Sequence, residues 1–273
     1  MDIKSLWDFS DPAESEAVFR GLLDEASPDD ALSLQTQIAR TYGLRKRFDD
    51  AHALLDRLEP DLVVAGPEPR VRHLLERGRA LRSAGRAGEA APFFARAVGL
   101  ADNSGLDELT VDAMHMVAIV TPDPAGQLDW NRRALEIAEH SPDPNARSWE
   151  ASLANNIGMT LHDEGRYEEA LASFETALVA RERAGASTQV AWWMVAWTLR
   201  SAKRHDEALE ILQRLEQRGF VEAETGENLL ALGRADEARP HFARAYEQLS
   251  ADESLDRPED AQLERWLALS HAR

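Results

Sequence analysis

The stretch from Ala151 to Arg183 determines how this chain folds, and it reads ASLANNIGMTLHDEGRYEEALASFETALVARER. Two runs rich in Ala, Leu, Glu and Arg, which favour helix, flank the hexad Gly165-Arg166-Tyr167-Glu168-Glu169-Ala170. A Gly after a helix can adopt the left-handed conformation that ends it. Acidic residues in the first turn of the next helix interact favourably with its dipole. The stretch therefore predicts two helices joined by a tight turn.

The same hexad occurs five times along the chain, and the other copies begin at Lys46, Gly85, Lys203 and Gly233. Further apolar residues follow the last residue of the hexad by four and seven positions. The sets are Ala51, Leu55, Leu58; Ala90, Phe94, Ala97; Ala170, Phe174, Ala177; Ala208, Leu212, Leu215; and Ala238, Phe242, Ala245. A degraded copy contains Gln127, Asn131 and Ala134, with Trp130 one position early. Repetition at intervals of 30 to 43 residues predicts an array of similar units.

Each copy is preceded by a second helical run with a small residue of its own, which lets two helices approach closely. A larger residue follows one turn later and fills the remaining gap. The pairs are Ala39 with Tyr42, Gly78 with Leu81, Gly158 with Leu161, Ala196 with Leu199, and Gly226 with Leu229, with His115 and Ala118 in the degraded copy. The two runs of each unit are therefore expected to pack as a tight helical hairpin.

This pattern resembles the tetratricopeptide repeat, a helix-turn-helix unit of about 34 residues. The resemblance covers roughly residues 32–250, although most copies lack the consensus Trp and most spacings exceed the consensus. It implies an all-α fold: a right-handed superhelical solenoid of about six helical hairpins. We expect a single domain over residues 1–273, with an N-terminal cap helix within 1–31, repeats over 32–250 and a C-terminal cap helix within 251–273.

The two expected caps have their own signals. Asp11-Pro12 combines an N-cap residue with Pro in the first turn of a helix. Arg257-Pro258 opens a last helix that carries Leu263, Trp266 and Leu267 on one side. A solenoid needs such terminal elements to cover the apolar face of its last repeat.

Composition excludes several classes of function. The formal net charge of -18 disfavours nucleic acid and anionic membranes as partners, because both attract basic surfaces. The chain has no Cys and no apolar window of about 20 residues. Its start, Met1-Asp2-Ile3-Lys4, lacks the features of a signal peptide, so we expect a cytoplasmic location. Basic residues are almost all Arg, which together with abundant Ala is typical of a GC-rich bacterial genome.

Motifs that carry chemistry are missing from the sequence. The eight His residues show no pair four positions apart, as a helical metal site would require. The chain has no phosphate-binding loop and no Gly-x-Ser-x-Gly motif. Acidic pairs occur mainly in the hexads, where the start of a helix explains them. We expect no catalytic residue, no metal and no cofactor.

The resemblance implies a concave face lined by the first helix of each hairpin, and this face is the candidate binding site. By the register above, it carries Arg40, Arg72, Arg79, Arg82, Asp112, Met116, Asn155, Asn156, Met159, His162, Trp193, Trp197 and Arg200. The Arg group could face an acidic segment of a partner, or it could pair with carboxylates of this acidic chain.

Amide and aromatic side chains form the other candidates on this face. Asn155 and Asn156 could grip a peptide backbone, since an amide both donates and accepts, or they could form a solvated or capping pair. Trp193 and Trp197 share one helix face and could be interface anchors or core residues. Trp192 matches the conserved Trp position of the repeat, so we expect it in the core.

These features together predict a non-catalytic adaptor that binds a protein or an extended peptide segment. Two alternatives stay open. The chain could be a sensor or regulatory subunit without an output domain of its own, because the repeats take up most of its length. It could also assemble with copies of itself, since solenoid ends and faces can pair.

Overall fold

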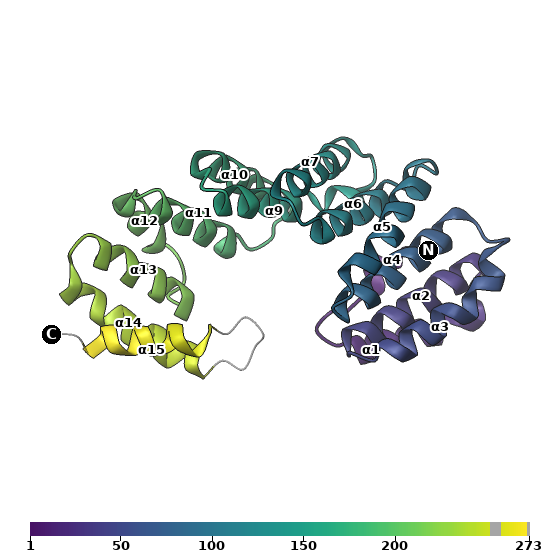
Figure 1. Ribbon diagram of the computed structural model, residues 1–273, viewed down its shortest axis with the longest axis horizontal. Coiled ribbons are helices and arrows are strands. Elements are labelled where there is room, and N and C mark those ends of the chain that lie inside the picture. Colours follow the sequence, from purple (N-terminus) through teal and green to yellow (C-terminus); the bar gives the residue numbers. More distant parts are fainter. Residues whose placement is uncertain (252–257, 272–273) are drawn as a thin grey trace. The chain divides into compact units, whose positions relative to one another are not determined.

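The computed structural model describes residues 1–251 and 258–271 of the chain, and helices make up most of these ranges (Figure 1). No strand occurs within them. The chain forms two compact units, Met1–Leu153 (unit 1) and Ala154–Arg273 (unit 2). The expected all-α fold of helical hairpins is confirmed. No helix in the described part of the chain has the length and apolar character that a membrane span requires.

Unit 1 contains an N-terminal helix, three hairpins and a short helix. The bounds are α1 Pro12–Leu22, α2 Pro28–Leu44, α3 Phe48–Leu62, α4 Pro67–Ser83, α5 Ala87–Asp102, α6 Asp107–Val120, α7 Pro124–His140 and α8 Pro144–Arg147. Helix α9, Glu150–Asp163, begins in unit 1 and ends in unit 2.

Unit 2 continues the alternation and ends with a single helix. The bounds are α10 Tyr167–Arg183, α11 Gln189–Ser201, α12 His205–Leu212, α13 Gly219–Ala231, α14 Ala235–Ser250 and α15 Asp260–His271. We call α2, α4, α6, α9, α11 and α13 the first helices, and their successors α3, α5, α7, α10, α12 and α14 the second helices.

The hexads form the turns between first and second helices, as predicted. Gly165 has a φ of 73°, and its N–H donates to the His162 carbonyl at 2.9 Å. The Arg166 N–H donates to the Leu161 carbonyl, also at 2.9 Å, which completes a Schellman motif. The same left-handed turn occurs at Gly85 and Gly233, and at two residues that are not Gly. These are Lys46 and Lys203, with φ of 59° and 62°.

The Arg at the second hexad position has a partner that the sequence analysis did not assign. Arg166 Nε and Nη2 donate to the two carboxylate oxygens of Glu169 at 2.8 and 2.7 Å. The equivalent pairs are Arg47–Asp50, Arg86–Glu89, Arg204–Glu207 and Arg234–Glu237. The acidic residue three positions after the Arg therefore both favours the helix start and fixes the Arg beside the turn.

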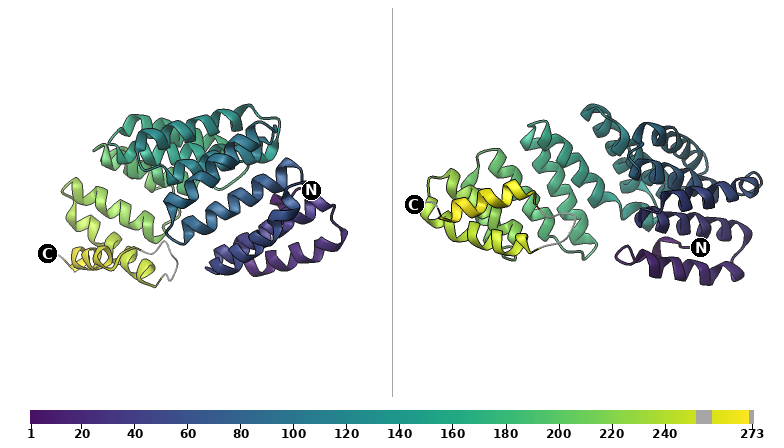
Figure 2. Two further views of the ribbon diagram at one scale, coloured as in Figure 1. Left: turned by 45° about the vertical axis from the view of Figure 1, so that its right-hand side comes forward. Right: turned by 60° about the horizontal axis from the view of Figure 1, so that its bottom comes forward.

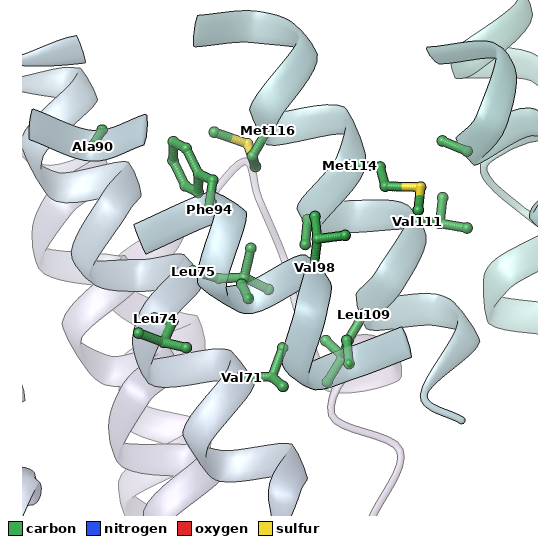
Figure 3. Close-up of a cluster of buried hydrophobic side chains, with 14 of the residues drawn as sticks. Val71, Leu74, Leu75, Ala90, Phe94, Val98, Leu109, Val111, Met114 and Met116 are labelled. Atoms are coloured by element: carbon green, nitrogen blue, oxygen red, sulfur yellow. The ribbon is translucent and has the colours of Figure 1, made fainter. Parts of the chain in front are cut away.

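Buried phenyl rings fill three of the hairpins, at the apolar position four residues after the last Ala of the hexad. Phe94, Phe174 and Phe242 are fully buried. Each ring lies against the Gly of its preceding helix, at Gly78, Gly158 and Gly226 respectively. In unit 1, Figure 3 shows Phe94 and Val98 of α5 beside Val71 and Leu75 of α4 and Met114 of α6, within one apolar cluster.

Helices α1 and α15 lie at the two ends where cap helices were expected. The Asp11 side chain accepts the backbone N–H groups of Ala13 and Glu14, each at 3.0 Å, and starts α1. At the other end α15 packs on α14, and Leu263 and Trp266 join the cluster that contains Phe242. Leu267 is half-buried. Arg257, the expected start of the last helix, lies outside the described residues.

Candidate binding surfaces on the first helices

The first helices of unit 1 bring charged side chains together in the interior. Arg79 of α4 donates two hydrogen bonds to the Asp112 carboxylate of α6, one of them at 2.6 Å. Arg79 Nη1 also donates to Glu76 Oε1. Arg40 of α2 lies 3.8 Å from the same Glu76 oxygen. These four side chains form what we call the charged floor of unit 1.

Ionisation of the charged floor is set by burial and by these pairings. Burial alone lowers the pKa of the Arg79 guanidinium, but the Asp112 and Glu76 carboxylates outweigh burial and raise it. Burial raises the pKa of the Asp112 carboxyl, but Arg79 and Arg40 outweigh it, so that this pKa is lowered. Burial, with repulsion from Arg79, lowers the pKa of Arg40. The floor is therefore a set of mutually compensated charges.

The other sequence-predicted residues of unit 1 have varied surroundings. Arg72 pairs with Glu68 one turn earlier in α4, at 2.9 Å. Arg82 is exposed, and with the buried Met116 it lines a cavity of about 230 Å³. Pairing with carboxylates of the chain itself, the alternative left open above, thus describes Arg40, Arg72 and Arg79.

A second cavity in unit 1, of about 300 Å³, is closed partly by the start of the chain. Its lining includes Arg79, Glu108 and Asp112 from the first helices. Lys4 and Trp7, which precede α1, also line it. Burial, with repulsion from Asp112, raises the pKa of the Glu108 carboxyl.

The first helices of unit 2 carry a row of aromatic rings. His162 of α9 stacks on Trp197 of α11, with ring centroids 3.4 Å apart and planes 26° from parallel. Trp197 and Trp193 are nearly parallel at 6.2 Å. Trp193 then meets Phe220 of α13 edge to face, also at 6.2 Å. We call these four side chains the aromatic row.

The end of the aromatic row opens into a cavity of about 520 Å³. Val190, Trp193, Phe220 and Val221 supply its apolar lining, and Gln189, Glu216 and Arg218 are among the polar residues around it. Trp193 Nε1 donates to the Phe220 carbonyl at 3.1 Å, which fixes the half-buried indole beside the cavity. Val190 is 62% exposed. An apolar cavity with a few polar groups is typical of ligand sites.

The remaining sequence-predicted residues of unit 2 lie near this row or along the same helices. Arg200 of α11 forms an ion pair with the buried Glu224 of α13. Burial raises the pKa of Glu224, and Arg200 offsets part of that increase. Asn155, Asn156 and Met159 of α9 are half-buried.

The expectation that Trp192 belongs to the core is wrong. Its side chain is 36% exposed, whereas Ala191 and Val195 of the same helix are buried. Trp192 shares a helix face with the buried Val195 and Ala196, three and four positions later. It is the fourth residue of α11, and this start of the helix face is not fully covered.

Two parts of these surfaces were missed by sequence reasoning. Phe220 lies six residues before Gly226, just as Arg72 lies six residues before Gly78, so the repeat register could have identified it. Lys4 and Trp7 precede the first repeat and belong to no periodic pattern. No sequence signal placed them beside the first helices.

Two family models of the tetratricopeptide repeat match the chain, over residues 36–105 and 149–218, which together make up about half of it. Neither describes a catalytic domain. No curated protein matches the sequence.

Solved structures match over almost the whole chain at low sequence identity. The apo form of RapI has a TM-score of 0.78 and 11% identity, over 99% of this chain and 79% of RapI. The apo form of the quorum sensor NprR from B. thuringiensis has a TM-score of 0.63 and 13% identity, over 94% and 75% of the two chains. NprR in complex with its cognate peptide NprX has a TM-score of 0.54 and 15% identity, over 98% and 83%. At such identities the likeness shows the fold alone.

Proposed function

We propose that this chain, which belongs to the tetratricopeptide repeat family, is a non-catalytic scaffold that binds a peptide segment on the first helices of unit 2. The aromatic row carries the proposal. Trp193 and Phe220 border a cavity of about 520 Å³ whose rim includes the exposed Val190. Large aromatic side chains at such positions are typical anchors of interfaces.

The chemistry of this surface favours a segment with a large apolar side chain. The cavity accepts that side chain among Val190, Trp193 and Phe220. Gln189 and Arg218 lie beside it and supply groups that donate to backbone carbonyls. Asn155 and Asn156 on α9 remain part of the proposed site as additional amide groups. Arg200 is tied to Glu224, so we assign it a supporting role.

A second candidate is a sensor subunit, in which binding of the peptide is the signal itself. Two structures of one neighbour support it: NprR is a quorum sensor, and it has been crystallised with its cognate peptide. Both candidates require the same binding event, so one test addresses both. The self-assembly alternative predicts instead that the surface binds another copy of this chain.

Two exposed Val residues of unit 2 provide a matched test. Val190 is 62% exposed at the cavity on α11, and Val179 is 57% exposed on the second helix α10. Peptides selected from a displayed random library on the unaltered protein would be measured on Val190→Asp and Val179→Asp. A carboxylate at the cavity should lower affinity at least about tenfold, because it must lose water on binding. The same change at Val179 should leave affinity unaltered.

Equal binding to both variants would remove this surface from consideration, and so would selection of no peptide.

A truncation of Trp193 distinguishes an interface anchor from a core residue. Trp193→Ala should lower affinity by about 2 kcal/mol or more if the indole is an anchor. Loss of a core Trp would instead appear as a sharp fall of the melting temperature. Sedimentation of the unaltered chain over a range of concentrations tests self-assembly.

A further inference from the structure

The start of the chain lies against unit 1 as a short segment that contacts helices far apart in sequence. We call Asp2–Phe9 the N-terminal segment; it contains one turn of 3-10 helix, Lys4–Leu6. In both views of Figure 2 the N-terminus lies against the helices of unit 1. The segment's side-chain contacts with the rest of unit 1 include those of Ile3, Lys4, Leu6 and Trp7. Asp2 also accepts a hydrogen bond from Asn145 Nδ2 at 3.3 Å, and the Phe9 ring lies 5.1 Å from the Arg40 guanidinium.

Ile3 and Trp7 attach the segment to α1 and α2. Ile3 is 2% exposed and belongs to the apolar cluster that includes Phe19 and Leu34. Trp7 meets the Phe19 ring edge to face at 5.0 Å. Its Nε1 donates to Gln37 Oε1 of α2 at 3.0 Å. A bound apolar ligand that carries one hydrogen-bond donor would make contacts of the same kind.

Lys4 attaches the same segment to the region of α8, more than 140 residues away in the sequence. Its ammonium donates to Ser148 Oγ at 2.7 Å and to the Asn145 carbonyl at 3.2 Å. It also lies 5.3 Å from the centre of the Trp149 ring. Two oxygen acceptors beside an aromatic face form a binding site for a cation.

The N-terminal segment lies beside the charged floor, and a cavity remains between the two. The cavity of about 300 Å³ lies between Lys4 and Trp7 on one side and Arg79, Glu108 and Asp112 on the other. Arg40 of the floor faces the ring of Trp7 at 5.3 Å. Ile3, Lys4 and Trp7 are therefore bound by residues of α1, α2 and α8 and by the two residues that follow α8.

We propose that the N-terminal segment is an intramolecular ligand of unit 1, and that it competes with an external peptide of the same pattern. That pattern is an aliphatic residue, then a cation, and an aromatic residue three positions after the cation. The proposal rests on the proposed function only in holding that first helices of this chain bind peptides. It concerns residues of unit 1 that the aromatic row of unit 2 does not include.

The tethered segment should weaken the binding of an external peptide by an amount that can be estimated. A short tether holds its ligand at an effective concentration on the order of millimolar. The apparent dissociation constant of an external peptide equals its intrinsic value divided by the fraction of molecules whose site is free. For a peptide with a dissociation constant of about 10 to 100 μM, the tethered segment should therefore weaken binding by roughly tenfold to a hundredfold.

The test uses a fluorescently labelled synthetic peptide with the sequence of residues 2–9, DIKSLWDF, and measures its anisotropy. Three proteins are compared: the unaltered chain, a chain without residues 2–9, and the full-length double variant Lys4→Ala with Trp7→Ala. The peptide should bind both altered proteins at least about tenfold more tightly than the unaltered chain. The double variant keeps the complete chain but only Ile3 of the three side chains, so its tethered segment competes weakly, and it covers the case in which the deletion does not fold.

Peptide variants identify which side chains of the segment bind. Changing Lys4 or Trp7 to Ala within the peptide should abolish binding to the altered proteins. Changing Ser5 to Ala should have no effect, because Ser5 is exposed and donates only to the Asp2 carbonyl inside the segment. Val190→Asp in unit 2 should not alter this affinity, so failure here and failure of the proposed function are distinguishable.

The proposal is overturned if the double variant, folded by circular dichroism, shows no saturable binding of the peptide. It is also overturned if the unaltered chain and the altered chains bind the peptide equally. In either case the segment would be a fixed part of the fold and would not act as a ligand.

Discussion

Gly158 of α9 lies so close to the ring of Phe174 in α10 that a Cβ on Gly158 would come within 2.6 Å of Phe174 Cε1. A Cβ added to Gly78 would likewise come within 2.4 Å of Phe94 Cε1, and a Cβ added to Gly226 within 2.8 Å of Phe242 Cε1. Each of these rings is fully buried and cannot move away without disturbing its neighbours. The spacing between first and second helix in these hairpins is therefore set by a hydrogen atom facing a phenyl ring.

Gly158→Ala should accordingly lower the free energy of unfolding of unit 2 by about 1–3 kcal/mol, through overpacking. Urea denaturation followed by circular dichroism measures it. Gly99→Ala is the matched control, since Gly99 is also within a helix but a Cβ there would meet nothing within 4 Å. The control should stabilise unit 1 by about 0.5–1 kcal/mol, because Ala is the better helix former. An unchanged Gly158→Ala midpoint would mean that the ring has room to shift.

Two substitutions at the left-handed turns should change stability in opposite directions. Gly165→Ala should cost about 1 kcal/mol, because a residue with a Cβ is strained at a φ of 73°. Lys203 already occupies that conformation with a φ of 62°, so Lys203→Gly should relieve strain. The gain, up to about 1 kcal/mol, is reduced by the greater freedom of Gly in the unfolded chain. Thermal melts of the two variants should shift in opposite directions, and shifts of the same sign would contradict the account.

The buried carboxylate of Glu222 should make unit 2 sensitive to acid. Burial by itself raises the pKa of this carboxyl, but hydrogen bonds from Arg244, at 2.7 and 2.9 Å, and from His241 outweigh burial and lower it. A carboxyl whose pKa is depressed by folding stabilises the protein above its unfolded-state pKa. That stabilisation is lost as the pH falls through the lower, folded-state pKa.

Glu222→Gln should therefore lower the free energy of unfolding by about 1–3 kcal/mol near pH 7. The difference from the unaltered chain should shrink as the pH falls through the lowered, folded-state pKa of Glu222, because both side chains are neutral below it. Denaturant titrations at several pH values measure it. Glu237→Gln, in the exposed pair with Arg234, is the control and should have little effect. A difference that does not depend on pH would show that Glu222 acts by packing alone.

The last helix should be required to cover the final hairpin. Trp266 is 2% exposed, packs in the cluster with Phe242, and donates from Nε1 to Glu227 Oε1 at 3.0 Å. Trp266→Ala should lower the free energy of unfolding of unit 2 by about 3–5 kcal/mol. It should also increase binding of an apolar dye, because α14 becomes uncovered. Gln262→Ala, at an exposed position of α15, should change neither measurement.

Much of the local structure could be predicted from residue types and spacing, because it depends on interactions within a few turns of helix. The hexad contains its own helix stop, its left-handed residue and the acidic residue of the next first turn. The positions of Phe94, Phe174 and Phe242 opposite small residues follow from the same register. Trp192 shows the limit of this reasoning: the register is right for the buried Ala196 and Leu199 of the same helix, yet Trp192 is 36% exposed.

The sequence by itself determined an all-α chain of helical hairpins, because stop signals, small residues and apolar stripes act locally and repeat in order. Only the tertiary structure decided which charges and rings meet. Arg79 meets Asp112 from the next hairpin, Trp193 meets Phe220 two helices away, and Lys4 meets Ser148 from the far end of unit 1. The repeat register places Arg79, Asp112, Trp193 and Phe220 on first helices, but it does not determine these contacts. They depend on how successive hairpins stack and on where the non-repeating start of the chain lies, and neither is encoded in the spacing of a single repeat.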